Sequence, residues 1–437
     1  MIKQRSIKDS STFLLISVVI IMTGLIYARD LMGISISKYI LLVVAVVPAF
    51  FMSYSSLIYF VCFLFPIASG IPDNHVFPLL AIILLIKKPI ALQRNALICF
   101  FVILFFEFMH YPFYDFSIRL SNVVGYSTTI FFLCYFSVLK QFEVNNKQCI
   151  MYFCLGLLVL LLGIWYITRI NGGVEMLLES SQRIGETRVL YSVDDTIVLN
   201  MNSNALGYYS IVGLSLLFVM YYLNKMRFIL LFLMSAVFVY VGSLSVSRTW
   251  LISVVLLIVA FMIMIPKVRT TKNGFRYFML LALVVMGAYA LFQNEFIYQA
   301  FFNRMTDASV STGNGRVEAF QDYNKALIGN PFYLIFGAGA IHYGDVLNIN
   351  LSVHNGLQQI LVSYGIIGFV FFLVIAIKAF RMNYRKGFVI CSIPFLVAFF
   401  FIQSGQFLFP QYNMYPFIAC FIALRLSDDD KIIISKK

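Results

Sequence analysis

The sequence predicts an all-α polytopic membrane protein with about 14 (12–14) transmembrane helices and a long external loop that contains short helices. Composition is the first observation, because 61% of the 437 residues are hydrophobic and only 12% are charged, whereas soluble domains are about half apolar and a quarter charged. Apolar runs also recur along the whole chain, which leaves no room for a separate soluble domain. The basic residues, finally, are concentrated in the short segments between those runs.

The predicted helices follow the apolar runs in order. They lie at residues 12–28, 36–52, 54–69, 75–87, 95–109, 118–138, 150–168, 205–223, 227–245, 249–265, 275–293, 355–378, 387–404 and 411–425. No small-residue cleavage site with a soluble domain follows the first run, so we interpret it as a membrane helix rather than a signal peptide. Segments two to four are short for a perpendicular crossing, which needs about 20 residues, so 12 or 13 spans remain open.

The net charge of +13 has two interpretations. A basic chain can bind nucleic acid, but most of these charges fall in alternate short loops, which is the positive-inside pattern of membrane proteins. We therefore place both termini in the cytoplasm and expect no nucleic-acid partner. The seven cysteines fall in membrane segments or on the cytoplasmic side, so we expect no structural disulfide.

Two long loops interrupt the apolar rhythm, and both lie outside in this topology. The resulting organisation comprises N-terminal transmembrane helices (1–168), a first external loop (169–204), central transmembrane helices (205–293), a long external loop (294–352), and C-terminal transmembrane helices with a cytoplasmic tail (353–437). Within the long loop, apolar residues at Val317, Phe320, Ala326 and Leu327 predict an amphipathic helix on the membrane surface. Loops of this length are uncommon unless they have a function, so we expect these two loops to contribute to one.

Histidines occur only at the predicted outer side, at His75, His110, His342 and His354. We interpret His75 and His110 as polar anchors at the interface. His354 follows Ser352, a suitable helix N-cap, and immediately precedes an apolar run. We therefore place it in the first helical turn, where the helix dipole disfavours the protonated ring. A neutral imidazole is what a general base requires, and Gly365 and Gly368 farther along would permit close helix packing.

Arginines also gather on this side, against the positive-inside trend. Arg248 begins the tenth segment, and a charge at that depth is a functional candidate by default, with snorkelling to the interface as the alternative. Arg316 follows a Gly-Asn-Gly turn and opens the predicted loop helix, where amides and a guanidinium could bind phosphate or simply be solvated. Arg183 and Arg188 are weaker candidates, because each could pair with Glu186 or Asp194 instead.

These groups together predict a transfer reaction at the outer membrane surface. Arginines would hold a pyrophosphate, which leaves easily once its charge is neutralised, and His354 would remove the proton from an attacking hydroxyl. No P-loop, HExxH, GxSxG or DxD-like motif stands in the outer loops, so the sequence calls for no metal and no nucleotide cofactor.

The motifs resemble the signature of the O-antigen polymerase and O-antigen ligase superfamily. His354-Asn355, nine residues, and then Gly365-x-x-Gly368 match its histidine motif. Ser-Arg-Thr at Arg248 and Gly-x-Gly-Arg at Arg316 resemble its two arginine sites, in the same order along the chain. The resemblance covers roughly residues 200–404, while the first half of the chain is similar only in hydropathy.

The resemblance implies a GT-C-like glycosyltransferase of the bacterial inner membrane whose active site faces the periplasm. Its donor would be a glycan on undecaprenyl pyrophosphate, with His354 as the base and Arg248 and Arg316 on the pyrophosphate. In a polymerase the acceptor is another undecaprenyl-linked repeat unit, and in a ligase it is lipid A-core. The helix count favours the polymerase, as do the amides of Gln403 and Gln406, where some ligases carry an acid. A chain-length regulator is a further partner that the resemblance allows.

A transporter or lipid flippase is the alternative from another class. Transporters place charges or broken helices near the bilayer midplane. Glu107 is the one clear carboxylate within the predicted segments, and it lies near an outer end. This scarcity of membrane charge argues against proton-coupled transport.

Overall fold

The structure is a computed structural model that describes residues 2–88, 94–109, 111, 120–138, 144–170, 199, 201–264, 271–306, 316–385, 389–405, 407–408 and 411–426. Within this described part every regular element is a helix, which confirms the all-α prediction. Large apolar side chains such as Phe13 and Phe101 are 75% and 62% exposed, as expected of helices that face lipid.

Each predicted segment contains a helix. These helices are α1 (Ile2–Asp30), α2 (Lys38–Phe51), α3 (Tyr54–Leu64), α4 (Asp73–Lys87), α5 (Arg94–Phe108), α6 (Leu120–Val138), α7 (Asn146–Ile170), α9 (Ser203–Tyr222), α10 (Phe228–Ser243), α11 (Arg248–Met264), α12 (Thr271–Gln293), α18 (Gly356–Arg385), α19 (Ile393–Ile402) and α20 (Tyr415–Ala423). Short 3-10 turns, η1 (Ala68–Gly70), η6 (Val389–Ser392) and η7 (Gln411–Met414), precede α4, α19 and α20.

Length separates these helices into two groups. Four stretches in the described part are long and apolar enough to cross a membrane, at Ser10–Asp30, Asn146–Ile170, Ser203–Tyr222 and Gly356–Val374. Shorter apolar helical stretches of 10–17 residues occur elsewhere in the described part, for example at Lys38–Phe51 and Phe228–Ser243. The chain is thus a multi-pass membrane protein, while the number of about 14 crossings stays a prediction.

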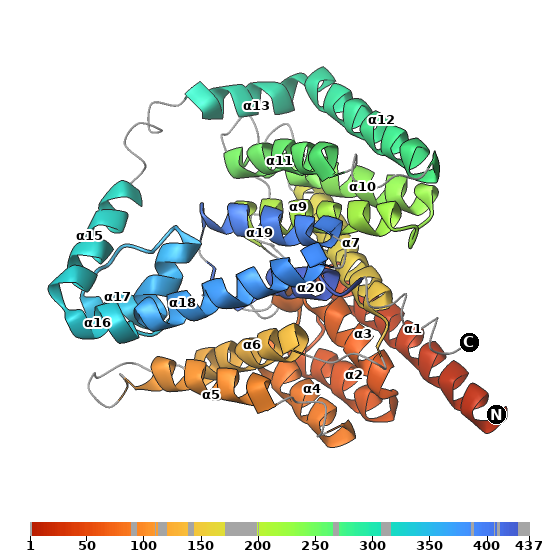
Figure 1. Ribbon diagram of the computed structural model, residues 1–437. Coiled ribbons are helices and arrows are strands. Elements are labelled where there is room, and N and C mark those ends of the chain that lie inside the picture. Colours follow the sequence, from red (N-terminus) through yellow and green to blue (C-terminus); the bar gives the residue numbers. More distant parts are fainter. Residues whose placement is uncertain are drawn as a thin grey trace.

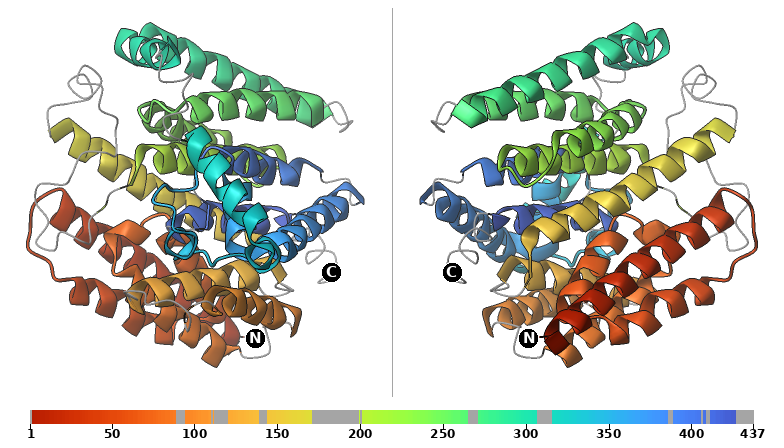
Figure 2. Two further views of the ribbon diagram at one scale, coloured as in Figure 1. Left: turned by 90° about the vertical axis from the view of Figure 1, so that its left-hand side faces the viewer. Right: turned by 90° about the vertical axis from the view of Figure 1, so that its right-hand side faces the viewer.

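The helices stack in successive layers (Figure 1). Helices α12 and α13 (Glu295–Thr306) form one outer layer over α10 and α11, and α5 with α6 and α2–α4 form the opposite side. Helices α9, α19, α18 and α20 lie between them, and the side views show the same order (Figure 2). The centre is α9, because all of its residues except Asn204 are buried. A helix that is apolar all round is stable only when other helices cover every face.

The long loop (residues 294–352) contains four further short helices, α13, α15 (Arg316–Gly329), α16 (Pro331–Phe336) and α17 (Tyr343–Leu347). Helices α15, α16 and α17 lie together at one end of the molecule, away from the start of α1, whereas α13 lies over α11 (Figure 1). The predicted loop helix is confirmed as α15, and its position on the membrane surface stays a prediction. Ala319, Tyr323 and Leu327 are buried, whereas Val317 and Phe320 are 52% and 45% exposed. The reason is that α15 covers a small core built by the rest of the loop and by α18.

Helix α18 is not the regular helix that the sequence suggested. Gly365 takes φ +62° and kinks it. A Cβ atom at Gly365 would lie 2.2 Å from the carbonyl oxygen of Ile335, so the glycine allows the end of α16 to touch α18 backbone to backbone. The predicted close packing at Gly365 is therefore against the loop rather than against a neighbouring membrane helix. At Gly368 the atoms nearest to a Cβ atom would be those of the Tyr364 side chain in the same helix.

A buried ion pair at the end of α1 holds the chain segment that precedes α9. It was not predicted from the sequence. Arg29 and Asp30 at the end of α1 are joined at 2.6 Å and are almost fully buried. Arg29 also donates to the carbonyl of Gly70 at 2.9 Å, and Asp30 accepts the amide of Leu199 at 3.0 Å. These extra hydrogen bonds offset the cost of burying both charges, and they tie α1, η1 and the approach to α9 together.

Candidate active site

His354 lies in the turn that leads into α18. The predicted cap was wrong, because Asn355 rather than Ser352 caps the helix: its Oδ1 accepts the amide of Gln358 at 3.0 Å. His354 is therefore just ahead of the first turn instead of within it. The side-chain amide of Asn355 also donates to the carbonyl of Gln403 at 3.2 Å. This bond fixes the histidine turn against the end of α19.

The imidazole of His354 opens into a pocket of about 130 Å³, here named the His354 pocket. Its walls come from the start of α9, the end of α19 and η7 with the residues around it. The lining comprises Asn202, Asn204, Ala205, Tyr208, Phe401, Ile402, Ser404, Gly405, Tyr412 and Asn413. Most of these side chains can donate or accept hydrogen bonds without carrying charge, which suits a site that binds sugar hydroxyl groups.

Electrostatics keep the imidazole in its neutral form. Partial burial of the ring lowers the pKa of His354, and the positive charge of nearby Arg316 lowers it further. From the sequence we expected the helix dipole to disfavour the protonated ring of His354. In the structure, burial and an arginine on α15 lower the pKa instead. A neutral ring can accept a proton from a hydroxyl placed in the pocket.

Arg316 is the one predicted arginine whose charge acts on His354 in the described part of the chain. It is exposed at the first position of α15. Two contacts hold α15 beside the histidine turn, because the Gln358 side chain donates to the Phe320 carbonyl at 2.8 Å and to Asn324 Oδ1 at 3.2 Å. Residues that are distant along the chain thus bring the arginine and the histidine together.

Arg248 occupies the first position of α11, after a turn in which Val246 takes φ +44°. Its Nε atom is buried and finds no hydrogen-bond partner among the described residues. The turn lies against α9 at Gly207, where a Cβ atom would come within 3.0 Å of Ser245 Oγ and 3.6 Å of Phe401. Since Phe401 also lines the His354 pocket, the Arg248 turn borders that pocket through α9.

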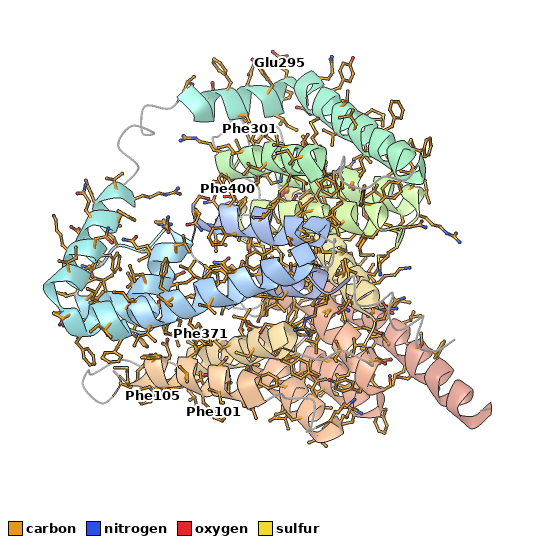
Figure 3. The ribbon with its side chains drawn as sticks, in the orientation of Figure 1. Phe101, Phe105, Glu295, Phe301, Phe371 and Phe400 are labelled. Carbon is orange, nitrogen blue, oxygen red and sulfur yellow. The ribbon has the colours of Figure 1, made fainter. Side chains whose placement is uncertain are left out.

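Two apolar grooves lie on opposite flanks of the central layer. The Trp250 groove, about 410 Å³, runs between α9, α10, α11, α12 and α13, with Phe218, Trp250 and Phe301 in its lining. The rings of Trp250 and Phe301 stack at 6.4 Å, and Phe301 points from α13 toward α11 (Figure 3). The Tyr364 groove, about 140 Å³, runs between α5, α6, α18 and α20 and includes Tyr364 and Phe371. The described residues that line either groove carry no charge.

A comparison with known families agrees with these motifs. A family model described as O-antigen ligase matches residues 239–373. The match places residues 239–373 in the O-antigen polymerase and ligase superfamily. The matched stretch contains Arg248, Arg316, His354, Gly365 and Gly368. Members of the superfamily are membrane enzymes of the glycosyltransferase type that act on lipid-linked glycans. No curated protein matches this chain.

Several residues singled out in the sequence lie outside the described part of the chain. They are Arg183 and Arg188, which we predicted to bind pyrophosphate, His110, which we interpreted as a polar anchor, and the turn at residues 312–315 that precedes Arg316. Of the remaining histidines, His75 is exposed in the first turn of α4. His342 lies 3.0 Å from Asp345 in the long loop.

One residue of the His354 pocket was not predicted from the sequence. Tyr208 on α9 lines the His354 pocket, and its buried hydroxyl has no hydrogen-bond partner among the described residues. Leaving a buried hydroxyl without a hydrogen-bond partner costs free energy. A substrate in the pocket could supply that partner. Nothing in the sequence pattern marks it, because α9 is rich in tyrosine and all its faces are apolar.

Proposed function

We propose that this protein polymerises lipid-linked oligosaccharide repeat units on the periplasmic side of the bacterial inner membrane. His354 removes the proton from a sugar hydroxyl of an undecaprenyl-linked acceptor unit. The hydroxyl oxygen then attacks the anomeric carbon of the donor glycan, and the bond from that carbon to the pyrophosphate breaks. Undecaprenyl pyrophosphate leaves with both bonding electrons, and the glycan is one repeat unit longer.

The His354 pocket supports the acid–base part of this proposal. Its imidazole has a lowered pKa, so the proton-accepting form predominates at neutral pH. The neutral polar lining can orient a sugar ring without competing for the proton. Positioning of this kind contributes much of the rate in transfer reactions.

Arginines provide the other half of the mechanism. Arg248, with an unsatisfied Nε beside α9, is proposed to bind the donor pyrophosphate together with Arg316, and Arg183 and Arg188 are proposed to add to that site. A guanidinium matches phosphate oxygens in a bidentate fork. Neutralising the charge that develops on the leaving pyrophosphate lowers the barrier. No step in this scheme requires a metal ion.

The observation that carries polymerase over ligase is the pair of apolar grooves that flank the His354 pocket. A polymerase handles two polyprenyl chains at once, one on the donor and one on the acceptor. The Trp250 groove includes Trp250, which follows Arg248 closely in α11, and we propose that it holds the donor chain. The Tyr364 groove includes Ile360 and Tyr364 of α18, the helix that follows His354. Its volume of about 140 Å³ suits a single chain better than the several acyl chains of lipid A. Ligation to lipid A-core remains the second candidate.

Transport is less well supported. Glu107 is the only carboxylate that we predicted within the membrane segments. It accepts hydrogen bonds from two backbone amides. A proton carrier needs a carboxyl group that can exchange its partners during transport, and this one is built into a loop contact.

The proposal also fixes the topology. We place residues 169–204 and 294–352 in the periplasm and the helices of 1–168, 205–293 and 353–437 in the membrane, with both termini inside. Cysteine accessibility can test this arrangement: a thiol reagent that does not cross the inner membrane should label a cysteine introduced at exposed Lys325 in α15. Protection of that position would contradict the proposed orientation.

Reconstitution tests the reaction itself. Purified protein in vesicles is given one lipid-linked repeat unit, and the products are separated by length. A ladder of longer lipid-linked glycans is expected. If the same vesicles extend nothing but transfer the unit to added lipid A-core, the ligase is correct. If they only move the glycan across the bilayer, the enzyme proposal fails. Addition of a chain-length regulator would then show whether the ladder narrows.

A further inference from the structure

Glu107 is a fully buried carboxylate at the end of α5, and the proposed chemistry does not use it. Its Oε2 accepts the amide of Ala340 at 2.5 Å, and its Oε1 accepts the amide of Ile341 at 3.0 Å. Both donors belong to the long loop, far from α5 in sequence. Burying a carboxylate costs several kilocalories unless such bonds replace its hydration, so the contact is specific to this arrangement.

The loop segment that Glu107 holds is bound to α18 as well. The amide of Ala338 donates to the carbonyl of Val362 at 2.8 Å, and that of Gly339 donates to Ser363 at 3.0 Å. Four consecutive amides of the loop, from Ala338 to Ile341, are thereby divided between α18 and the Glu107 carboxylate. The loop segment therefore lies clamped between the end of α5 and the part of α18 around Val362.

Glycines make room for this clamp at positions where no other residue fits. Gly337 takes φ +80°, and a Cβ atom there would lie 2.3 Å from the carbonyl of Ser363. Gly339 takes φ +79° and lies directly against Glu107. Left-handed backbone of this kind is accessible mainly to glycine, so the segment is shaped for this contact.

The clamped segment connects the two parts of the proposed site. Upstream lies α15, which carries Arg316, and downstream the chain returns to His354. The loop core joins both, because Tyr323 of α15 packs in one cluster with Val353 and Val362. The Tyr323 hydroxyl also donates to the Leu351 carbonyl at 2.6 Å. Any displacement of the clamp therefore moves Arg316 relative to the histidine.

We propose that Glu107 is a positioning residue, which holds the long loop so that Arg316 stays beside His354 during glycan transfer. The proposal rests on the proposed function, since it assigns Glu107 to that same site. The carboxylate touches neither substrate nor His354. It acts through the amides of Ala340 and Ile341.

The test compares Glu107→Gln with Glu318→Gln, a matched change on the exposed surface of α15. The glutamine keeps the size of the side chain but turns an NH₂ group toward one loop amide, so one hydrogen bond is lost. Hydrogen exchange at residues 338–341 should become about tenfold to a hundredfold faster in Glu107→Gln, as expected for a lost bond to a charged acceptor, and should not change in Glu318→Gln. Unchanged exchange in Glu107→Gln overturns the clamp.

Activity gives the second readout in the reconstituted system. Among the described residues, the charged or titratable groups that face His354 are Arg316 from α15, Tyr208 from α9 and Tyr412 from η7. When Arg316 moves away, protonation of His354 becomes easier. The acidic limb of the rate profile should therefore shift to higher pH in Glu107→Gln, with kcat/KM lowered about tenfold to a hundredfold. A purely structural role would lower the amount of active enzyme without moving the profile, and that result would refute positioning.

A second variant covers the case in which Glu107→Gln does not fold. Gly339→Ala disturbs the clamp from the loop side and leaves α5 intact, and the same shift of the pH profile is expected. If wild-type protein forms no polymer, the proposed function fails, yet the exchange comparison still decides whether Glu107 holds the loop.

Discussion

Replacing Gly365 by alanine should destabilise the fold at the kink of α18. The residue takes φ +62° and ψ −167°, a region open almost only to glycine, where another residue costs about 1–3 kcal/mol. The new Cβ would also lie 2.2 Å from the Ile335 carbonyl oxygen and 2.6 Å from the Phe336 amide nitrogen. Backbone atoms cannot rotate away, so overpacking adds about 1–3 kcal/mol. Together the loss is about 2–6 kcal/mol, a large part of a typical folding stability.

The assay is unfolding of the purified protein in detergent, followed by helical circular dichroism, with Gly24→Ala as the control. Gly24 lies within α1, and a Cβ there would meet nothing within 4 Å, so its replacement should be neutral or stabilising by about 0.5–1 kcal/mol. The kinked variant should also lose polymer formation, because α18 positions both His354 and the Tyr364 groove. Equal unfolding curves and equal activity for the two variants would refute the assignment of the kink to Gly365.

Three further predictions concern the proposed site and use the reconstituted polymerase assay. His354→Ala should insert normally and lose about 10²–10⁴-fold in rate, as expected for a general base, and full-length polymer from that variant would exclude His354 from catalysis. Arg248→Lys should lose most activity, because an ammonium ion does not reproduce a bidentate fork; wild-type polymer would reduce Arg248 to a snorkelling side chain. Arg316→Gln removes a charge that lowers the pKa of His354, so that pKa should rise and the acidic limb of the rate profile should move to higher pH. An unmoved limb would mean that the two side chains are too far apart to interact.

The positions of the helices were predictable from the sequence because long apolar runs are stable only when they are buried in lipid or in the protein core. The shortest helices were not, since α16 and α17 have only six and five residues, and their stability comes from the loop core rather than from their own pattern. The residues of α15 that enter the loop core could not be predicted for the same reason. The partners of Tyr323 lie on α17, α18 and the turn before His354.

The candidate site was predictable where its residues are neighbours in the sequence. His354 and Asn355 stand next to each other, and a helix start follows them. The cap was assigned to Ser352 because serine has the right chemistry, and only the backbone geometry shows that Asn355 accepts the Gln358 amide. Tyr208 and Glu107 could not be assigned roles, because their partners come from α19 and the long loop and depend on tertiary packing.

The order of the layers also bears on how polymerisation would proceed. Helix α9 contributes Tyr208 to the His354 pocket and Phe218 to the Trp250 groove. Helix α18 begins just after His354 and supplies Tyr364 to the other groove. Two lipid chains held on these flanks bring both head groups to one pocket, which replaces a diffusive encounter by an effectively intramolecular one. After transfer, the lengthened glycan is attached to the lipid in the Tyr364 groove. Because the grooves are separated by the central helices, that lipid must leave through the membrane and enter the Trp250 groove before the same chain can serve as donor again.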